Sequence, residues 1–248
     1  MITFYDIATR LSPQAMAPNT FKTRLALNYK GIPYKTEWVE FPDIEAVVKR
    51  LGGTPTSKKA DGSDYYTLPM IHDSTTGKVV TDSIAIAEYL DATYPDKPLL
   101  FPPGTKAATA TLNHVFMQSL NPISPIMIYE VYGTLNQPSQ VYWRTTREAA
   151  IGKKLEEFAP PGPDRDEMWK QCKEGLDTLA GFYDRNGEGK RFFFADTFSF
   201  ADTIVIGFLV WIEITLGTTN EEWKAIAGWS NGRWGKLLES TRNLQAVN

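Results

Sequence analysis

The N-terminal part of the chain carries two kinds of hydrophobic pattern. Residues 2–6 and 34–40 alternate between apolar and polar side chains, which predicts two short strands. Residues 21–30 between them have apolar positions at helical spacing, and a glycine and a proline follow that end the helix. We therefore expect a strand, helix, strand unit with a right-handed connection. Residues 44–51 predict one more helix.

The middle of the chain alternates between loops and short elements. Residues 52–67 are rich in Gly, Pro, Ser, Lys and Asp, which predicts a long surface loop of a kind that is often functional. A strand-like run follows from Leu68-Pro69, and residues 78–81 predict a polar strand that leads into an apolar helix. Four prolines then interrupt every pattern between residues 91 and 106, which predicts a linker.

Helical patterns fill the rest of the chain. Apolar stripes predict helices at residues 109–132, 141–158 and 168–183, and two prolines should kink or end the first of them. Ser199 and Asp202 stand at capping-box spacing before the most apolar helix of the chain.

These patterns predict an α/β plus all-α fold. The expected domains are an α/β domain at residues 1–94, a linker at 95–106 and an all-helical domain at 107–248. A length of 248 residues with 42% hydrophobic content suffices for two modest cores.

Charge and composition limit the classes of function that the chain can have. A net charge of −3 without a basic tract argues against a nucleic-acid partner. We expect no membrane association and a cytoplasmic location, because there is no apolar run of spanning length and the N-terminus lacks signal-peptide features. The single cysteine, Cys172, excludes an intramolecular disulfide and is expected to be a packing residue. With only two histidines, no metal site is expected.

The Leu68-Pro69 dipeptide is the first candidate binding element. Proline favours an extended conformation of the residue before it, so Leu68 can offer its N–H and C=O to a peptide ligand as a strand does. A cis bond before Pro69 would turn this backbone outward.

The Asp82-Ser83 dipeptide is the second candidate. It stands where a strand gives way to a helix, so free N–H groups and the positive end of the helix dipole suit an α-carboxylate. The Asp82 carboxylate would suit an α-ammonium group. The alternative is an ordinary helix N-cap, because Ser and Asp are favoured there.

The spacing of the Leu68-Pro69 proline, the hairpin and the Asp82-Ser83 helix resembles the N-terminal domain of cytosolic glutathione transferases. The resemblance covers the whole chain and looks closest to a class from wood-decay fungi. That class is related to bacterial glutathione-dependent β-etherases and more distantly to the yeast prion-forming nitrogen regulator. The resemblance implies a thioredoxin-like first domain, a helical second domain, glutathione as co-substrate or bound ligand, and a homodimer.

The resemblance also directs attention to residues 17–24. In serine- and cysteine-type members, the partner of the glutathione sulfur lies seven residues before the basic residue that corresponds to Arg24, and here that position is Ala17. Asn19 is the best substitute, since the yeast regulator has a similar segment in which asparagine faces the sulfur. Thr20 is a second candidate and Ser12 a third. Alternatively, Asn19 and Thr20 only cap the helix.

Further residues are candidates for the other groups of the ligands. Lys58 and Lys59 in the long loop are candidates for the glycine carboxylate of glutathione, and Lys59 is preferred. The first helices of the helical half are rich in aromatic and methionine side chains, and the alternative is that most of them belong to the core. Aromatic faces with tyrosine hydroxyls suit flat phenolic ligands, and such a site lies beside the sulfur in the family. The predicted hydrophobic site consists of Phe116, Met117, Tyr129 and Tyr132. Tyr142 and Trp143 lie in the same cluster, and Phe208 and Trp211 are expected to close the far wall.

The predicted function is that of a glutathione transferase. A glutathione thiolate would attack electrophilic aromatic compounds, by conjugation or thiolytic ether cleavage, and the protein would also bind hydrophobic polyphenols. Because Ala17 lacks a donor, the alternative is a non-catalytic, ligandin-type carrier of aromatic compounds that keeps glutathione as a bound ligand.

Overall fold

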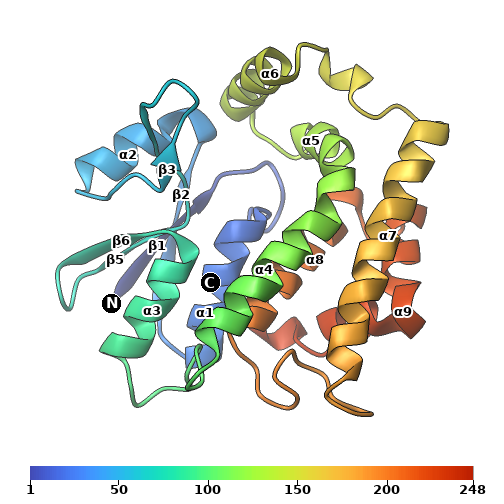
Figure 1. The fold of residues 1–248 in the computed structure, drawn as a ribbon. Helices are drawn as coiled ribbons and strands as arrows, with labels where there is room; N and C mark the ends of the chain where they lie inside the picture. The colour runs from blue at the N-terminus through green and yellow to red at the C-terminus, as the bar shows by residue number, and fades with distance from the viewer. Residues whose placement is uncertain (248) are drawn as a thin grey trace.

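The computed structural model describes residues 1–247 and has an α/β half beside a helical half (Figure 1). The α/β half is built on a sheet of order β2-β1-β5-β6, in which β1 and β2 are parallel and the other pairs antiparallel. Its strands are β1 (Ile2–Ile7), β2 (Tyr34–Val39), β5 (Met70–Asp73) and β6 (Lys78–Thr81). Its helices are α1 (Pro18–Lys30), α2 (Ile44–Arg50) and α3 (Ser83–Thr93). The predicted strand, helix, strand unit is therefore confirmed, with α1 joining the parallel pair.

The predicted long loop at residues 52–67 contains a small hairpin. Strands β3 (Ser57–Lys58) and β4 (Asp64–Tyr65) pair antiparallel and project from the sheet beside α2 (Figure 1). Two-residue strands are too short to show alternation, so the composition of this segment indicated only a loop.

The helical half follows the predicted order, but two of the predicted helices differ in extent and the last helix, α9, was not predicted. Its helices are α4 (Lys106–Leu120), α5 (Ser124–Tyr132), α6 (Gln137–Ile151), α7 (Pro163–Asp184), α8 (Phe200–Leu216) and α9 (Glu221–Glu239). The helix predicted at residues 109–132 is divided by the 3-10 turn Asn121–Ile123, as its prolines suggested. The helix predicted at 141–158 ends at Ile151, because Gly152 adopts a left-handed φ of 76°.

Helix α8 forms the centre of the helical half and is buried along most of its length. Its predicted capping box is present, since the Ser199 N–H donates to the Asp202 carboxylate at 2.9 Å. Cys172 of α7 is also buried, as expected, and burial raises the pKa of its thiol to about 12. In the part of the chain that the structure describes, no helix is long and apolar enough to cross a membrane.

Helix α8 packs closely against the start of α1. Gly207 makes this approach feasible, because a Cβ there would lie 2.9 Å from the Pro18 carbonyl oxygen and 3.4 Å from the Lys22 nitrogen. The two halves therefore meet where the first turn of α1 begins, and this turn carries the residues discussed next.

Candidate functional site

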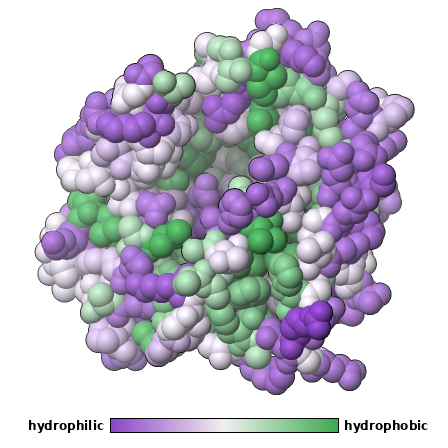
Figure 2. All heavy atoms as spheres, in the orientation of Figure 1, coloured by the Kyte–Doolittle hydropathy of each residue, from purple (hydrophilic) through white to green (hydrophobic). Residues whose placement is uncertain are grey.

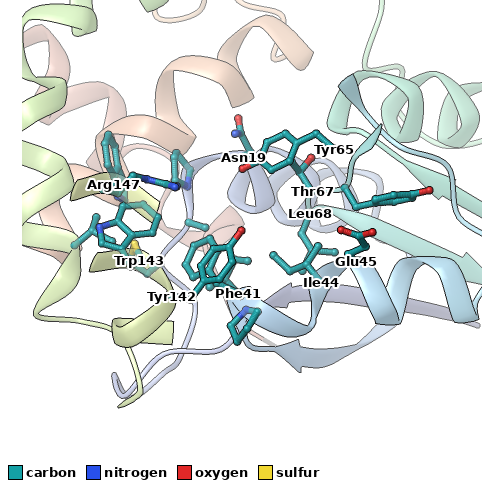
Figure 3. Close-up of a pocket in the computed structure, with 18 of the residues that line it drawn as sticks. Asn19, Phe41, Ile44, Glu45, Tyr65, Thr67, Leu68, Tyr142, Trp143 and Arg147 are labelled. Atoms are coloured by element: carbon teal, nitrogen blue, oxygen red, sulfur yellow. The ribbon is translucent and has the colours of Figure 1, made fainter. Parts of the chain in front are cut away.

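A cavity of about 460 Å³ opens between the two halves. Figure 2 shows it as a recess with apolar surface on its walls, between the region of α2 and α6. The α/β half contributes Asn19, Phe41, Ile44, Tyr65 and Leu68 among others, and the helical half contributes Val131, Tyr142, Trp143, Arg147 and Trp211 (Figure 3).

A smaller pocket of about 160 Å³ adjoins this cavity. Asn19, Thr67 and Leu68 line both spaces. The small pocket is otherwise lined mainly by polar and charged residues, among them Lys22, Asp82, Ser83 and Asn113. The first turn of α1 thus stands at the junction of a polar pocket and a largely aromatic cavity.

The backbone N–H and C=O groups of Leu68 lie at this junction. The Leu68-Pro69 bond is cis, as the sequence suggested. Within the described residues, neither the N–H nor the C=O of Leu68 makes a hydrogen bond, whereas the next carbonyl, that of Pro69, accepts the Asp82 N–H at 3.2 Å. Both Leu68 groups therefore remain available to a ligand backbone.

Asp82 and Ser83 lie together at the wall of the small pocket. The capping interpretation of Asp82 is confirmed, because one of its carboxylate oxygens accepts the N–H groups of Ile84 and Ala85 at 2.9 and 3.1 Å. Asp82 has a φ of 78°, which is uncommon for a non-glycine residue and is often found at functional positions. Ser83 is 5% exposed, and within residues 1–247 neither its N–H nor its hydroxyl has a hydrogen-bond partner.

Lys22 is a site residue that the sequence reasoning missed. It lines the small pocket with only 7% of its surface exposed, and its ammonium group lies 5.3 Å from the centre of the Phe208 ring. It forms no salt bridge or hydrogen bond with any described residue. Burial lowers the pKa of Lys22 to about 8, and the nearby charge of Asp82 partly offsets this effect. The signal available in the sequence was its position three residues after Asn19, on the same face of α1.

The start of α1 lacks a side-chain cap, because Ala17 is the N-cap residue. Among the described residues, the N–H groups of Asn19 and Thr20 and the amide of Asn19 have no hydrogen-bond partner. The Thr20 side chain does not line either space: it is fully buried, and its hydroxyl donates to the Ala17 carbonyl at 2.9 Å. Ser12 is absent from both linings as well. Free donors and the helix dipole at this turn favour an anion.

Lys59 lines the large cavity from the β3–β4 turn. Its ammonium group lies 3.8 Å from the Glu45 carboxylate, which also pairs with Lys49 at 2.7 Å. Lys58, the other lysine considered, points elsewhere and pairs with Asp64 at 2.6 Å.

The aromatic wall of the cavity differs from the one predicted. It consists of Phe41, Tyr65, Tyr66, Tyr142, Trp143 and Trp211. The Phe41 ring is parallel to that of Tyr142, with centres 6.3 Å apart, and lies 5.1 Å from that of Trp143. Three residues that the sequence analysis named do line this wall, namely Tyr142, Trp143 and Trp211. Phe41 was not predicted, because nothing in the sequence marks the short turn that carries it.

The four residues predicted for the hydrophobic site do not line this cavity, and packing explains why. Phe116 is fully buried against Phe208, and Met117 packs on the same core, because α4 uses its apolar stripe against α7 and α8. Tyr132 lies under the Arg144 guanidinium at 4.7 Å. Tyr129 borders a different pocket, between α5 and α7.

Comparisons with known proteins follow the same division of the chain. Residues 17–93 match the glutathione S-transferase N-terminal domain family, and residues 107–244 match the glutathione S-transferase C-terminal domain family. A curated glutathione S-transferase-like protein of Aspergillus flavus is 29% identical over 96% of this chain and 88% of its own length.

Solved structures of fungal proteins are similar over the full length. A glutathione S-transferase of Ceriporiopsis subvermispora, crystallised with glutathione, is 43% identical with a TM-score of 0.95, covering 100% of this chain and 98% of that one. A glutathione transferase of Phanerochaete chrysosporium is 42% identical with a TM-score of 0.94 and the same coverage. Glutaredoxin 2 of Salmonella typhimurium shares only the fold, at 12% identity and a TM-score of 0.68 over 100% of this chain and 96% of that one.

Proposed function

The chain belongs to the glutathione S-transferase family, and we propose that it binds glutathione in the small pocket and directs the thiolate into the aromatic cavity. The observation that carries this proposal is the junction itself. Asn19 and Leu68 line both spaces, so a ligand held in the small polar pocket would have its reactive end beside the aromatic cavity. The glutathione in the crystals of the Ceriporiopsis relative supports the choice of ligand.

The polar pocket suits the γ-glutamyl end of glutathione. Its α-ammonium group would face Asp82, and its α-carboxylate would meet Ser83 and Lys22, which forms no salt bridge with any described residue. The cysteinyl backbone would pair with the free N–H and C=O of Leu68. Lys59, at the rim of the cavity, is our candidate for the glycine carboxylate.

The sulfur would then lie at the first turn of α1. The Asn19 amide and the free N–H groups of Asn19 and Thr20 are donors that stabilise a thiolate, and the helix dipole adds to their effect. The thiolate would attack an electrophilic carbon of an aromatic compound stacked on Phe41, Tyr142 and Trp143. A carbon–sulfur bond forms as the leaving group departs with its electron pair, in conjugation or ether cleavage.

A second candidate function is carriage of polyphenols without turnover. The alanine at position 17 favours this carrier function, because its side chain at the cavity wall offers no hydrogen-bond donor to the sulfur. In that case, glutathione would remain a bound ligand and the aromatic cavity would store the compound.

The ultraviolet absorbance of the bound thiolate, followed across pH, tests the proposal. We expect a depressed thiol pKa in the parent protein and a higher one in Asn19→Ala, because the variant loses the amide donor. Asn113→Ala is the matched control: Asn113 lines only the small pocket, so its loss can weaken glutathione binding but should leave the thiol pKa of the bound glutathione unchanged. Bound glutathione with an ordinary thiol pKa in all three proteins would support the carrier function instead.

A further inference from the structure

Arg147 is the only arginine that lines the large cavity in the part of the chain that the structure describes. It projects from α6, and its guanidinium lies over the Trp143 ring, 4.1 Å from the ring centre, which is a cation–π contact with the aromatic wall. Only its Nη1 has a hydrogen bond, donated to the neighbouring Thr146 hydroxyl at 3.1 Å. Within residues 1–247 it forms no salt bridge, so its Nε and Nη2 donors are available.

The charges around the cavity are distributed unevenly. Glu45 faces it from α2 and lies near both Lys49 and Lys59, so that carboxylate already has cationic partners. Figure 3 shows Arg147 and Trp143 on the opposite side from Glu45, with Leu68 between them. The helical wall therefore carries a positive charge that the protein itself leaves uncompensated.

The neighbouring arginine of α6 has a different environment. Arg144 lies outside the cavity and is paired with Glu148 at 2.8 Å and Glu156 at 2.7 Å. Two arginines three positions apart on one helix are therefore neighbours, yet of these two only Arg147, which lines the cavity, lacks an acidic partner.

We propose that the second ligand of this protein is an aromatic carboxylate, whose ring stacks on Phe41, Tyr142 and Trp143 and whose carboxylate is bound by Arg147. The proposal rests on the proposed function for the position of the thiolate. A guanidinium offers two parallel donors that match a carboxylate, and such paired, charge-assisted hydrogen bonds are strong in a partly buried site. A neutral aromatic ring would use the same wall and leave this charge unpaired.

Two electrophiles that differ in charge test the proposal. 1-Chloro-2,4-dinitrobenzene is neutral, whereas 4-chloro-3,5-dinitrobenzoate carries a carboxylate, and both lose chloride when a thiolate attacks. We expect Arg147→Gln to lower kcat/KM for the benzoate by about tenfold or more and to change the value for the neutral compound by less than about twofold. Arg147→Lys should show an intermediate loss, because it keeps the charge without the planar fork.

Arg144→Gln is the matched control, and the ratio of the two kcat/KM values should be the same as in the parent protein. An equal fall for both electrophiles in Arg147→Gln, or no fall for either, would overturn the proposal. If the protein conjugates neither compound, the same comparison is made by binding. Titration with 3,5-dinitrobenzoate and 1,3-dinitrobenzene, followed by tryptophan fluorescence, then shows whether Arg147 distinguishes charge when catalysis is absent.

Discussion

Glu40, the residue that follows β2, accepts a hydrogen bond from the hydroxyl of Ser139 in α6, and this contact joins the two walls of the cavity. Asn136 donates to the other oxygen of the same carboxylate at 2.7 Å. The Ser139 oxygen in turn accepts the N–H of Phe41 at 2.9 Å. Because Phe41 also packs on the aromatic residues of α6, this network fixes the position of Phe41 relative to that helix.

Removing the Ser139 hydroxyl should loosen the cavity. In Ser139→Ala, the Phe41 N–H and one Glu40 oxygen lose a buried partner, so we expect the free energy of unfolding to fall by about 1–3 kcal/mol. Urea denaturation measures this change, and fluorescence titration should show weaker binding of aromatic ligands. Ser240→Ala, which removes a hydroxyl in α9's terminal turn far from the cavity, should leave ligand affinity unchanged. Unaltered ligand affinity in Ser139→Ala would show that the network has no part in shaping the site.

Lys22 should make glutathione binding depend on pH. Its pKa of about 8 means that the ammonium is mostly charged at pH 7 and loses its proton as the pH rises through 8. An anionic ligand favours the charged form, so affinity should fall between pH 7 and 9. S-Methylglutathione is the suitable probe in calorimetry, because it has no thiol that titrates in the same range.

Lys22→Met separates this effect from titration of the ligand. At pH 7 we expect its affinity to be about tenfold lower than that of the parent protein, since a charge-assisted contact is lost. Any pH dependence that remains in the variant belongs to the ligand's own amino group. An analogue without the α-carboxylate should bind both proteins equally, and a preference for the parent would contradict the assigned role.

Gly207 should be intolerant of even a methyl group. In Gly207→Ala the added carbon would lie 2.9 Å from the Pro18 carbonyl oxygen, so the start of α1 must move. We expect a loss of stability of about 1–3 kcal/mol together with weaker glutathione binding. Gly181→Ala in α7 is the control, because a Cβ there meets nothing within 4 Å, and it should stabilise the helix by about 1 kcal/mol. Equal effects of the two substitutions would argue against the close helix contact.

Ala17→Ser should reveal how far the missing donor limits turnover. Ala17 lines the cavity at the N-cap of α1, and a hydroxyl there can donate to the sulfur. We expect kcat/KM for 1-chloro-2,4-dinitrobenzene to rise by about tenfold, which corresponds to one additional hydrogen bond to a thiolate. If thermal stability rises and turnover does not, the new hydroxyl caps the helix instead, and the alanine is not what limits catalysis.

The sequence determined the features that depend on local interactions. Proline and glycine positions, apolar periodicity and the Ser199–Asp202 spacing act over a few residues, so they predicted most elements and the interruption of the helix at residues 109–132. Local chemistry likewise marked Leu68 and Asp82 as binding candidates, which the structure places around one small pocket.

Only the tertiary structure decided which side chains face the site. Periodicity shows that a helix has an apolar face, but it does not show whether that face meets the core or a cavity. Phe116 was assigned to the site and lies in the core, whereas Arg147 and Lys22 line the spaces without any sequence motif. The rotation of α4, α6 and α1 about their axes is set by packing between distant segments, and that packing is what brings these residues to the ligand.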